Sequence, residues 1–139
     1  MLNTFLMAKT DETFTTVDLL EIDLLSAEAK FIKAGAAPSY VLRGDRVHRI
    51  ESRTPPAGIL TRMCAEQTSF ALREGDFVIQ MSDGASCAGA DSAWLMGALT
   101  GQTYESAANL CERLFVMAGE SGEGGDDLTV SVVRIMNSK

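Results

Sequence analysis

Residues 77–84 read Phe77-Val78-Ile79-Gln80-Met81-Ser82-Asp83-Gly84, an apolar run that ends on a carboxylate. A second stretch, Gly124-Gly125-Asp126-Asp127, places two carboxylates directly before the apolar residues 128–133. Apolar runs of this length are typical of buried strands. Carboxylates at the tips of such strands are common ligands of hard divalent cations. The two stretches, separated by a long helical segment, therefore indicate a metal site built from two strand ends.

Length and composition indicate one acidic domain. The chain has 139 residues, 46% of them hydrophobic, which is enough to bury the core of a single domain. Its 12 basic and 19 acidic residues give a net charge of -7, which argues against nucleic-acid or anionic-membrane surfaces as partners. No apolar stretch approaches the roughly 20 residues that span a bilayer, and the first residues lack the basic region of a signal peptide. We expect a cytoplasmic chain without a membrane segment.

Nucleophilic catalysis by a serine or cysteine paired with a histidine is disfavoured. A Ser-His-Asp or Cys-His mechanism would depend on His48, which lies in a polar run typical of a solvated strand. The three cysteines, Cys64, Cys87 and Cys111, are odd in number and widely spaced. This pattern fits reduced thiols better than disulfides or a zinc site.

The first half of the chain predicts strands joined by hairpins. Residues 14–25 and 29–34 form one expected pair, and residues 39–43 and 46–51 form a second around the turn Gly44-Asp45. The polar ends of the second pair suggest an exposed sheet edge. Residues 63–72 alternate and lead through a polar turn into the strand ending at Asp83, which predicts a third hairpin.

The second half predicts two helices and a returning strand. Asp91 is a suitable N-cap for a helix over residues 92–99, and Thr103 for a longer helix that carries an apolar stripe to Ala118. The run from residue 128 to residue 135 carries apolar residues on both faces, as expected of a central strand covered on both sides. This order of elements predicts an α+β domain with a mainly antiparallel sheet and helices packed on one face.

Seven segments, in this order, resemble the stage II sporulation protein E family, the bacterial branch of the metal-dependent type 2C (PPM) serine/threonine protein phosphatases. The resemblance covers nearly the whole chain, and the last two motifs with their spacing are its most specific part. The segments are Asn3-Thr4-Phe5-Leu6, Phe14-Thr15-Thr16-Val17-Asp18-Leu19, Phe31-Ile32-Lys33-Ala34-Gly35-Ala36-Ala37-Pro38-Ser39, Pro56-Ala57-Gly58-Ile59-Leu60, Gly75-Asp76-Phe77-Val78, Ser82-Asp83-Gly84 and Gly124-Gly125-Asp126-Asp127-Leu128-Thr129.

The resemblance implies a fold, a site and a reaction. The fold would be an antiparallel β-sandwich flanked by helices, with a binuclear Mn²⁺ or Mg²⁺ site at one end. Asp83 and Asp126 would be metal ligands, Asp127 an adjacent group or occasional ligand, and Thr129 a structural residue. A metal-activated water would hydrolyse a phosphoserine or phosphothreonine ester. The implied substrate is a small phosphoprotein such as a phosphorylated anti-anti-sigma factor.

The chain departs from the family in one major respect. The family's earlier portion, with an Asp-Gly motif whose aspartate bridges the two metals, has no counterpart here. We therefore expect residues 1–139 to be a single partial domain, the C-terminal part with the N-terminal portion missing. Such a chain alone should be inactive, and its exposed sheet edges could support a homo-oligomer. The parent protein could carry a membrane anchor outside this chain.

Two other interpretations remain open. In the first, the chain is a catalytically incomplete, phosphatase-like binding or regulatory module. In the second, Asp83-Gly84 and Asp126-Asp127 are turn residues that cap strands, because Asp-Gly is a common turn dipeptide. Binding of Mn²⁺ and release of phosphate distinguish these interpretations.

Overall fold

The computed structural model describes residues 2–8, 13–60, 62, 64–83, 93–121 and 127–137. These residues belong to two compact units, one of Met1–Ala36 with Glu51–Leu72 and one of Ala37–Ile50 with Arg73–Lys139. Each unit is built on its own sheet, and every pairing between the described strands is antiparallel. The predicted α+β class with antiparallel sheets is confirmed. Among the described residues, no helix is long and apolar enough to cross a bilayer.

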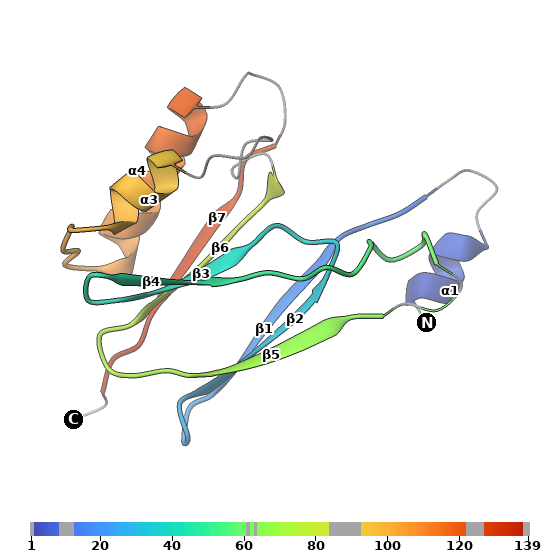
Figure 1. Cartoon of the computed structure of the whole chain (residues 1–139), viewed down its shortest axis with the longest axis horizontal. Helices are drawn as coiled ribbons and strands as arrows, with labels where there is room; N and C mark the ends of the chain where they lie inside the picture. Colours follow the sequence, from blue (N-terminus) through green and yellow to red (C-terminus); the bar gives the residue numbers. More distant parts are fainter. Residues whose placement is uncertain are drawn as a thin grey trace. The chain divides into compact units, whose positions relative to one another are not determined.

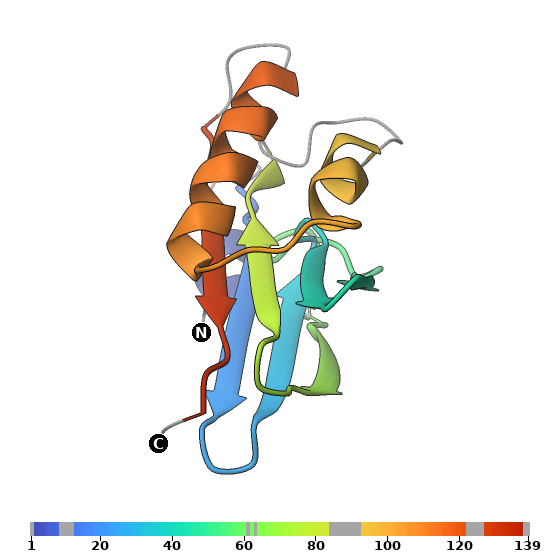
Figure 2. The ribbon, with the colours of Figure 1, turned by 90° about the vertical axis from the view of Figure 1, so that its left-hand side faces the viewer.

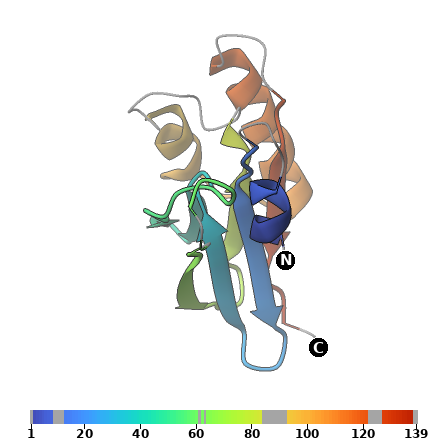
Figure 3. The same ribbon diagram turned by 90° about the vertical axis from the view of Figure 1, so that its right-hand side faces the viewer.

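The first unit is a three-stranded sheet with a short helix. Its elements are α1 (Leu2–Met7), β1 (Val17–Asp23), β2 (Glu28–Ala34) and β5 (Glu66–Ala71), and the strand order is β1-β2-β5 (Figure 1). The predicted hairpin of β1 and β2 is confirmed, with Val17 opposite Ala34 and Asp23 opposite Glu28 (Figure 3). Alternate residues of β2 are fully buried, and one of them is charged: Ala29, Phe31 and Lys33.

An ion pair joins β1 to β2 at that charged position. Lys33 Nζ lies 2.6 Å from Asp18 Oδ2, and the two residues are direct cross-strand partners. The Lys33 side chain is 2% exposed and the Asp18 side chain 19%. Burying an ammonium group is costly unless a carboxylate accompanies it, so the pairing accounts for a lysine at this core position.

The turn between β1 and β2 is organised by a side chain. Asp23 Oδ1 accepts hydrogen bonds from the N–H groups of Leu25 (2.8 Å) and Ser26 (3.2 Å). These bonds favour the carboxylate and lower the pKa of Asp23 below its ordinary value of 3.8. Ala27 completes the turn with φ at 54°, in the left-handed region that glycine adopts most readily.

The second unit is a four-stranded sheet with two helices. Its elements are β3 (Ser39–Arg43), β4 (Arg46–Ile50), β6 (Phe77–Met81), α3 (Ala93–Leu99), α4 (Ala107–Ser121) and β7 (Val130–Arg134), and the strand order is β4-β3-β6-β7. Both helices pack on one face of this sheet (Figure 2). The buried core between them comprises Tyr40, Leu42, Phe77, Ile79, Met81, Leu95, Ala98, Leu99, Leu110, Leu114 and Ala118.

Helix α4 follows its predicted stripe only in part and begins later than expected. The spacing predicts an apolar stripe of Tyr104, Ala107, Ala108, Cys111, Leu114, Phe115 and Ala118. Leu114 and Ala118 are buried as predicted, but Ala108 and Phe115 are exposed, and Leu110, which lies one turn before Leu114, is buried. The helix begins at Ala107 rather than near Thr103, because the Ser106 hydroxyl accepts a hydrogen bond from the Asn109 N–H at 3.1 Å and caps the first turn. The predicted cap at Asp91 lies outside the described residues.

The predicted hairpin of residues 63–83 is wrong. A turn does form at residues 74 and 75, but the strands on its two sides enter different sheets. Strand β5 pairs with β2, while β6 pairs with β3 and β7. Immediately before the turn, the Leu72 N–H bonds to the Ala27 carbonyl at 2.8 Å, whereas Asp76 after it bonds to Arg43 of β3. The strands before and after the turn therefore pair with different partners and not with each other.

The predicted central position of the final strand is also wrong. Strand β7 stands last in the order of the described strands, and its exposure alternates along the chain. Val130 and Val132 pack against the core under the helices, while Ser131 and Val133 are exposed. Within the part of the chain that the structure describes, side chains on one face of β7 pack against the core and those on the other face are exposed, so its successive valines do not mark a strand buried on both sides.

Candidate functional site

The structure brings two of the predicted carboxylates to neighbouring strand ends. Strand β6 ends at Met81, which lies opposite Val130, the first residue of β7. Asp83 follows β6 by two residues, and Asp127 precedes β7 by three. Both residues are exposed. Two carboxylates that lie 44 positions apart in the sequence, 127 minus 83, are thus held at the same end of the four-stranded sheet.

Ser82 joins these two strand ends. Its hydroxyl donates to the carbonyl oxygen of Asp127 at 3.1 Å and accepts from the N–H of Thr129 at 2.9 Å. Its own N–H donates to the Thr129 carbonyl at 3.0 Å. The three bonds continue the β6–β7 ladder beyond the last pair of residues in the strands. Ser82 therefore fixes the backbone that carries Asp83 against the backbone that carries Asp127.

The strands that present the carboxylates are anchored in the core. Four of the five residues of β6 are buried, and Ile79 is fully buried. On β7, Val130 and Val132 pack under the helices. Burial of these side chains stabilises each strand by about 1.5–3 kcal/mol per large apolar residue. The strand ends are thus rigidly placed while the carboxylates beyond them face solvent.

The donor set is compatible with a hard divalent cation but small. Carboxylate oxygens suit Mn²⁺ and Mg²⁺, which take about six ligands, several of them waters. Within the part of the chain that the structure describes, no three His, Cys, Asp or Glu side chains gather closely enough to hold an ion. The third predicted ligand, Asp126, lies outside the described residues, as does Gly84. The described site therefore offers Asp83 and Asp127 as donors.

Ser82 is the member of the site that sequence reasoning missed. The residue was visible in the run that ends at Asp83, but its bonds reach a strand more than forty residues away, and no local pattern encodes them. The structure describes two of the three cysteines. Cys64 and Cys111 are free, as predicted, and the Cys111 thiol contacts the Val130 carbonyl at 3.5 Å. Cys87 lies outside the described residues.

Several solved structures similar to this chain are phosphatase domains. The PP2C phosphatase domain with a fragment of the regulatory domain of the cell fate determinant SpoIIE from Bacillus subtilis matches with a TM-score of 0.84 and 31% identity. The manganese-presoaked phosphatase domain of the same protein matches with a TM-score of 0.74 and 34% identity. The PPM Ser-Thr phosphatase MsPP from Mycobacterium smegmatis, at 19% identity and a TM-score of 0.73, shows likeness of fold alone. The fold is that of the PP2C-type (PPM) phosphatase domains.

Family and sequence comparisons make this class more specific. The family model described as stage II sporulation protein E (SpoIIE) matches residues 1–136. Stage II sporulation protein E of Bacillus subtilis is 36% identical over 132 residues, which cover 91% of this chain. The protein of the same name from Priestia megaterium is 38% identical over 84 residues, 60% of this chain. The chain belongs to the stage II sporulation protein E (SpoIIE) family.

The chain corresponds to part of these relatives. It spans 16% of the length of the Bacillus subtilis protein and 14% of the Priestia megaterium protein. Of the solved structures, it covers 63% of the manganese-presoaked phosphatase domain and 43% of the chain that includes the regulatory fragment. In both cases 99% of this chain is matched.

Proposed function

We propose that residues 1–139 form one part of a metal-dependent phosphatase domain that hydrolyses phosphoserine or phosphothreonine in a small regulatory protein, such as a phosphorylated anti-anti-sigma factor. The observation that carries the proposal is the Ser82 bridge, which holds Asp83 and Asp127 at adjoining strand ends. Membership of the SpoIIE family and likeness to its phosphatase domain support the same reaction class.

The chain's own residues have defined roles in this proposal. Asp83 and Asp126 are ligands of Mn²⁺ or Mg²⁺, and Asp127 is an adjacent group or a further ligand. When bound, such ions supply Lewis acidity at the phosphoryl group and activate water for hydrolysis. Ser82 and Thr129 fix the strand ends, and the core under β6 and β7 keeps them from moving apart. Manganese is the ion used to soak a SpoIIE phosphatase domain, which makes it the first ion to test.

Titration calorimetry with Mn²⁺ tests the assignment of Asp83. Asp83→Asn removes one anionic donor with little change of shape, so we expect the dissociation constant to rise at least about tenfold. The matched control is Asp45→Asn, which neutralises an exposed carboxylate in the turn between β3 and β4 of the same unit. Equal affinities of the two variants would contradict a metal site at Asp83. No binding by the unmodified chain would mean that the site needs the rest of the domain or that these carboxylates serve only as turn residues.

Activity is tested in the full-length parent protein. Asp83→Asn or Asp126→Asn should abolish Mn²⁺-dependent phosphate release from a phosphoserine peptide while unfolding remains cooperative. Full activity in either variant would remove that residue from the site. The isolated 139-residue chain should release no phosphate, and turnover by it would refute the prediction that its site is incomplete. Metal binding without phosphate release by the parent would favour the binding-module interpretation.

A further inference from the structure

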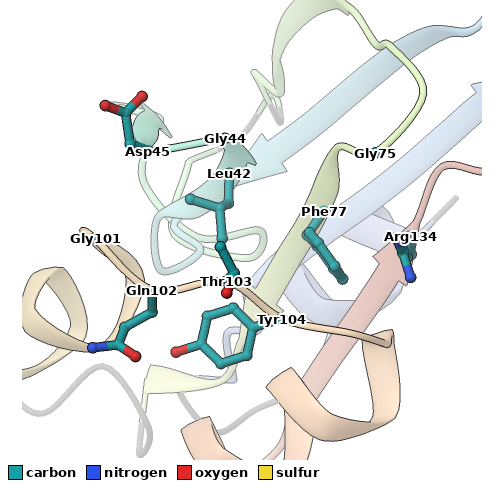
Figure 4. Close-up of a pocket in the computed structure, with 10 residues that line it drawn as sticks. All are labelled: Leu42, Gly44, Asp45, Gly75, Phe77, Gly101, Gln102, Thr103, Tyr104 and Arg134. Carbon is teal, nitrogen blue, oxygen red and sulfur yellow. The ribbon is translucent and has the colours of Figure 1, made fainter.

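A pocket of about 420 Å³ is lined by the residues drawn in Figure 4. It lies at the end of the four-stranded sheet opposite to Asp83 and Asp127. Its position follows from the register, because the first residue of β6, Phe77, pairs with the last residue of β7, Arg134. At about 3.3 Å per residue, Phe77 lies about 20 Å along the strand from Asp83. All residues that line the pocket belong to the second unit. The proposed phosphatase site does not use this pocket.

The floor of the pocket is apolar and fixed. Leu42 and Phe77 are 2% and 6% exposed, respectively. The rings of Phe77 and Tyr104 meet edge to face, with centroids 6.5 Å apart. The Tyr104 hydroxyl donates to the Ala98 carbonyl, so this ring is oriented and its polar end is already satisfied. The floor therefore offers aromatic and aliphatic surface to a ligand.

Among the residues that line the pocket, Arg134 carries a positive charge, and not all of its N–H groups have a hydrogen-bond partner among the described residues. The Arg134 guanidinium carbon lies 5.3 Å from the centre of the Phe77 ring, and Nη1 donates to the Glu105 carbonyl. Nε has no hydrogen-bond partner among the described residues, but it is buried and therefore not itself offered to a ligand. Guanidinium N–H groups donate to carboxylates in charge-assisted hydrogen bonds that are stronger than bonds between neutral groups. The arginine therefore favours an anionic group in the pocket.

The rest of the lining restricts the charge and size of that anion. Asp45 lines the pocket from the turn between β3 and β4, and Gln102 and Thr103 add uncharged polar groups (Figure 4). With one guanidinium, that of Arg134, and one carboxylate, that of Asp45, in its lining, the pocket suits a monoanion better than a dianionic phosphate. The volume lies within the range of about 300–1,000 Å³ that is usual for small-molecule sites. Gly44, Gly75 and Gly101 leave open space where side chains would stand, so backbone lines part of the entrance.

We propose that this pocket binds a small monocarboxylate with an aromatic or branched apolar body. The apolar body lies on Leu42, Phe77 and Tyr104, and the carboxylate accepts from the Arg134 guanidinium. For a ligand of about ten non-hydrogen atoms we expect a dissociation constant on the order of 1 mM. The inference is independent of the phosphatase proposal, because it involves neither Asp83 nor Asp127.

The test is a two-dimensional amide NMR titration of the 139-residue chain with phenylacetate at neutral pH. The amide signals of the three lining glycines report on the pocket, and they should shift saturably. Phenylacetamide keeps the ring and removes the charge, and acetate keeps the charge and removes the ring. Both should bind at least about tenfold more weakly, since each loses one of the two contacts. Absence of saturable shifts, or equal shifts with phenylacetamide, would overturn the proposal.

Two variants locate the binding. Arg134→Met keeps an unbranched side chain opposite Phe77 but removes the guanidinium, and should weaken phenylacetate binding at least about tenfold. Arg113→Met, on the exposed side of α4 and outside the pocket lining, should leave the affinity unchanged. If Arg134→Met loses the dispersed spectrum of a folded chain, Thr103→Trp replaces it, because it adds an indole at an exposed lining position and should block entry. Unchanged affinity in the folded variant would overturn the proposal.

Discussion

Arg43 holds the buried carboxylate of Asp76 with two of its nitrogens. Nε lies 2.9 Å from Oδ1, and Nη2 lies 2.6 Å from Oδ2. Asp76 is 1% exposed and also accepts from the Arg73 N–H at 2.8 Å. Its carbonyl oxygen accepts from the Ile135 N–H at 2.8 Å. The pair therefore joins the end of β3, the start of β6 and the residue after β7. The hydrogen bond with Asp76, opposed by desolvation, raises the pKa of Arg43.

Replacing Arg43 by methionine should cost about 3 kcal/mol of unfolding free energy. The change leaves the Asp76 carboxylate buried without its cation, and loss of one partner of a buried pair costs about 3–5 kcal/mol. The lower end applies because the Arg43 side chain is 25% exposed. Urea denaturation measures the effect. Arg46→Met, exposed at the start of β4, should change stability by less than about 0.5 kcal/mol. Equal effects of the two substitutions would show that the Arg43 pair is unimportant.

The Ser82 bridge predicts a coupled loss of stability and metal affinity. Ser82→Ala removes the two side-chain bonds to Asp127 and Thr129, which should cost about 1–2 kcal/mol. If Asp83 and Asp127 bind one ion, the same substitution should raise the Mn²⁺ dissociation constant severalfold, because the two strand ends are then less well aligned. Calorimetry and urea denaturation measure the two effects. Ser131→Ala, exposed on β7, serves as the control.

The turns, strands and helices that could be predicted are those specified by residues close together in the sequence. The Gly44-Asp45 turn places Arg43 opposite Arg46, as its residues suggest. The apolar run at residues 77–81 forms β6, and Leu114 and Ala118 of the predicted stripe on α4 are buried. The pairing of β5 was not predictable in this way. Its following turn has ordinary hairpin chemistry, but the choice of sheet depends on Arg43, which lies 33 positions from Asp76.

The candidate site was predictable to a similar extent. Carboxylates beside apolar runs, together with the family resemblance, correctly indicated that the ends of β6 and β7 adjoin. The means of alignment was not predictable, because the Ser82 hydroxyl acts only after β6 and β7 have paired. The pocket containing Arg134 has no sequence signal, since it combines two turns, three strands and the segment between two helices. The assignment of Asp83, Asp126 and Asp127 as ligands remains a prediction.

The ion pair of Lys33 with Asp18 predicts non-additive stability changes. Asp18→Leu alone leaves the Lys33 ammonium, 2% exposed, without its carboxylate, and we expect a loss of about 3 kcal/mol. Adding Lys33→Met removes the buried charge, and the double variant should recover most of that loss. Urea denaturation of both single variants and the double variant gives the coupling. Additive losses would mean that the pair does not couple the two strands.

Replacing Ala27, in the turn between β1 and β2, by glycine should increase the stability of the folded chain. Ala27 has φ at 54°, where a Cβ is disfavoured. Ala27→Gly relieves that strain but increases the freedom of the unfolded chain, so we expect a net gain of about 0.5–1 kcal/mol. The control is Ala108→Gly on the exposed side of α4, which should instead destabilise by about 1 kcal/mol. Thermal unfolding distinguishes the two, and destabilisation by Ala27→Gly would show that the turn does not require a left-handed residue.

The same turn predicts a local dependence on pH. Bonds from the N–H groups of Leu25 and Ser26 lower the pKa of Asp23 in the folded chain below 3.8. A group with a lowered folded pKa contributes stability above its unfolded pKa and loses it as the pH falls through the folded value. The amide signals of Leu25 and Ser26 should therefore titrate with a midpoint below 3.8.

The stability difference between the unmodified chain and Asp23→Ala should be constant near neutral pH, where the Asp23 carboxylate is ionised in both the folded and unfolded states. It should shrink as the pH falls from about 5 to about 2, because protonation removes the charge that strengthens the two amide bonds. Urea denaturation at a series of pH values measures this difference. A gap that stays constant to the lowest pH would mean that Asp23 stabilises the turn through its shape rather than through its charge.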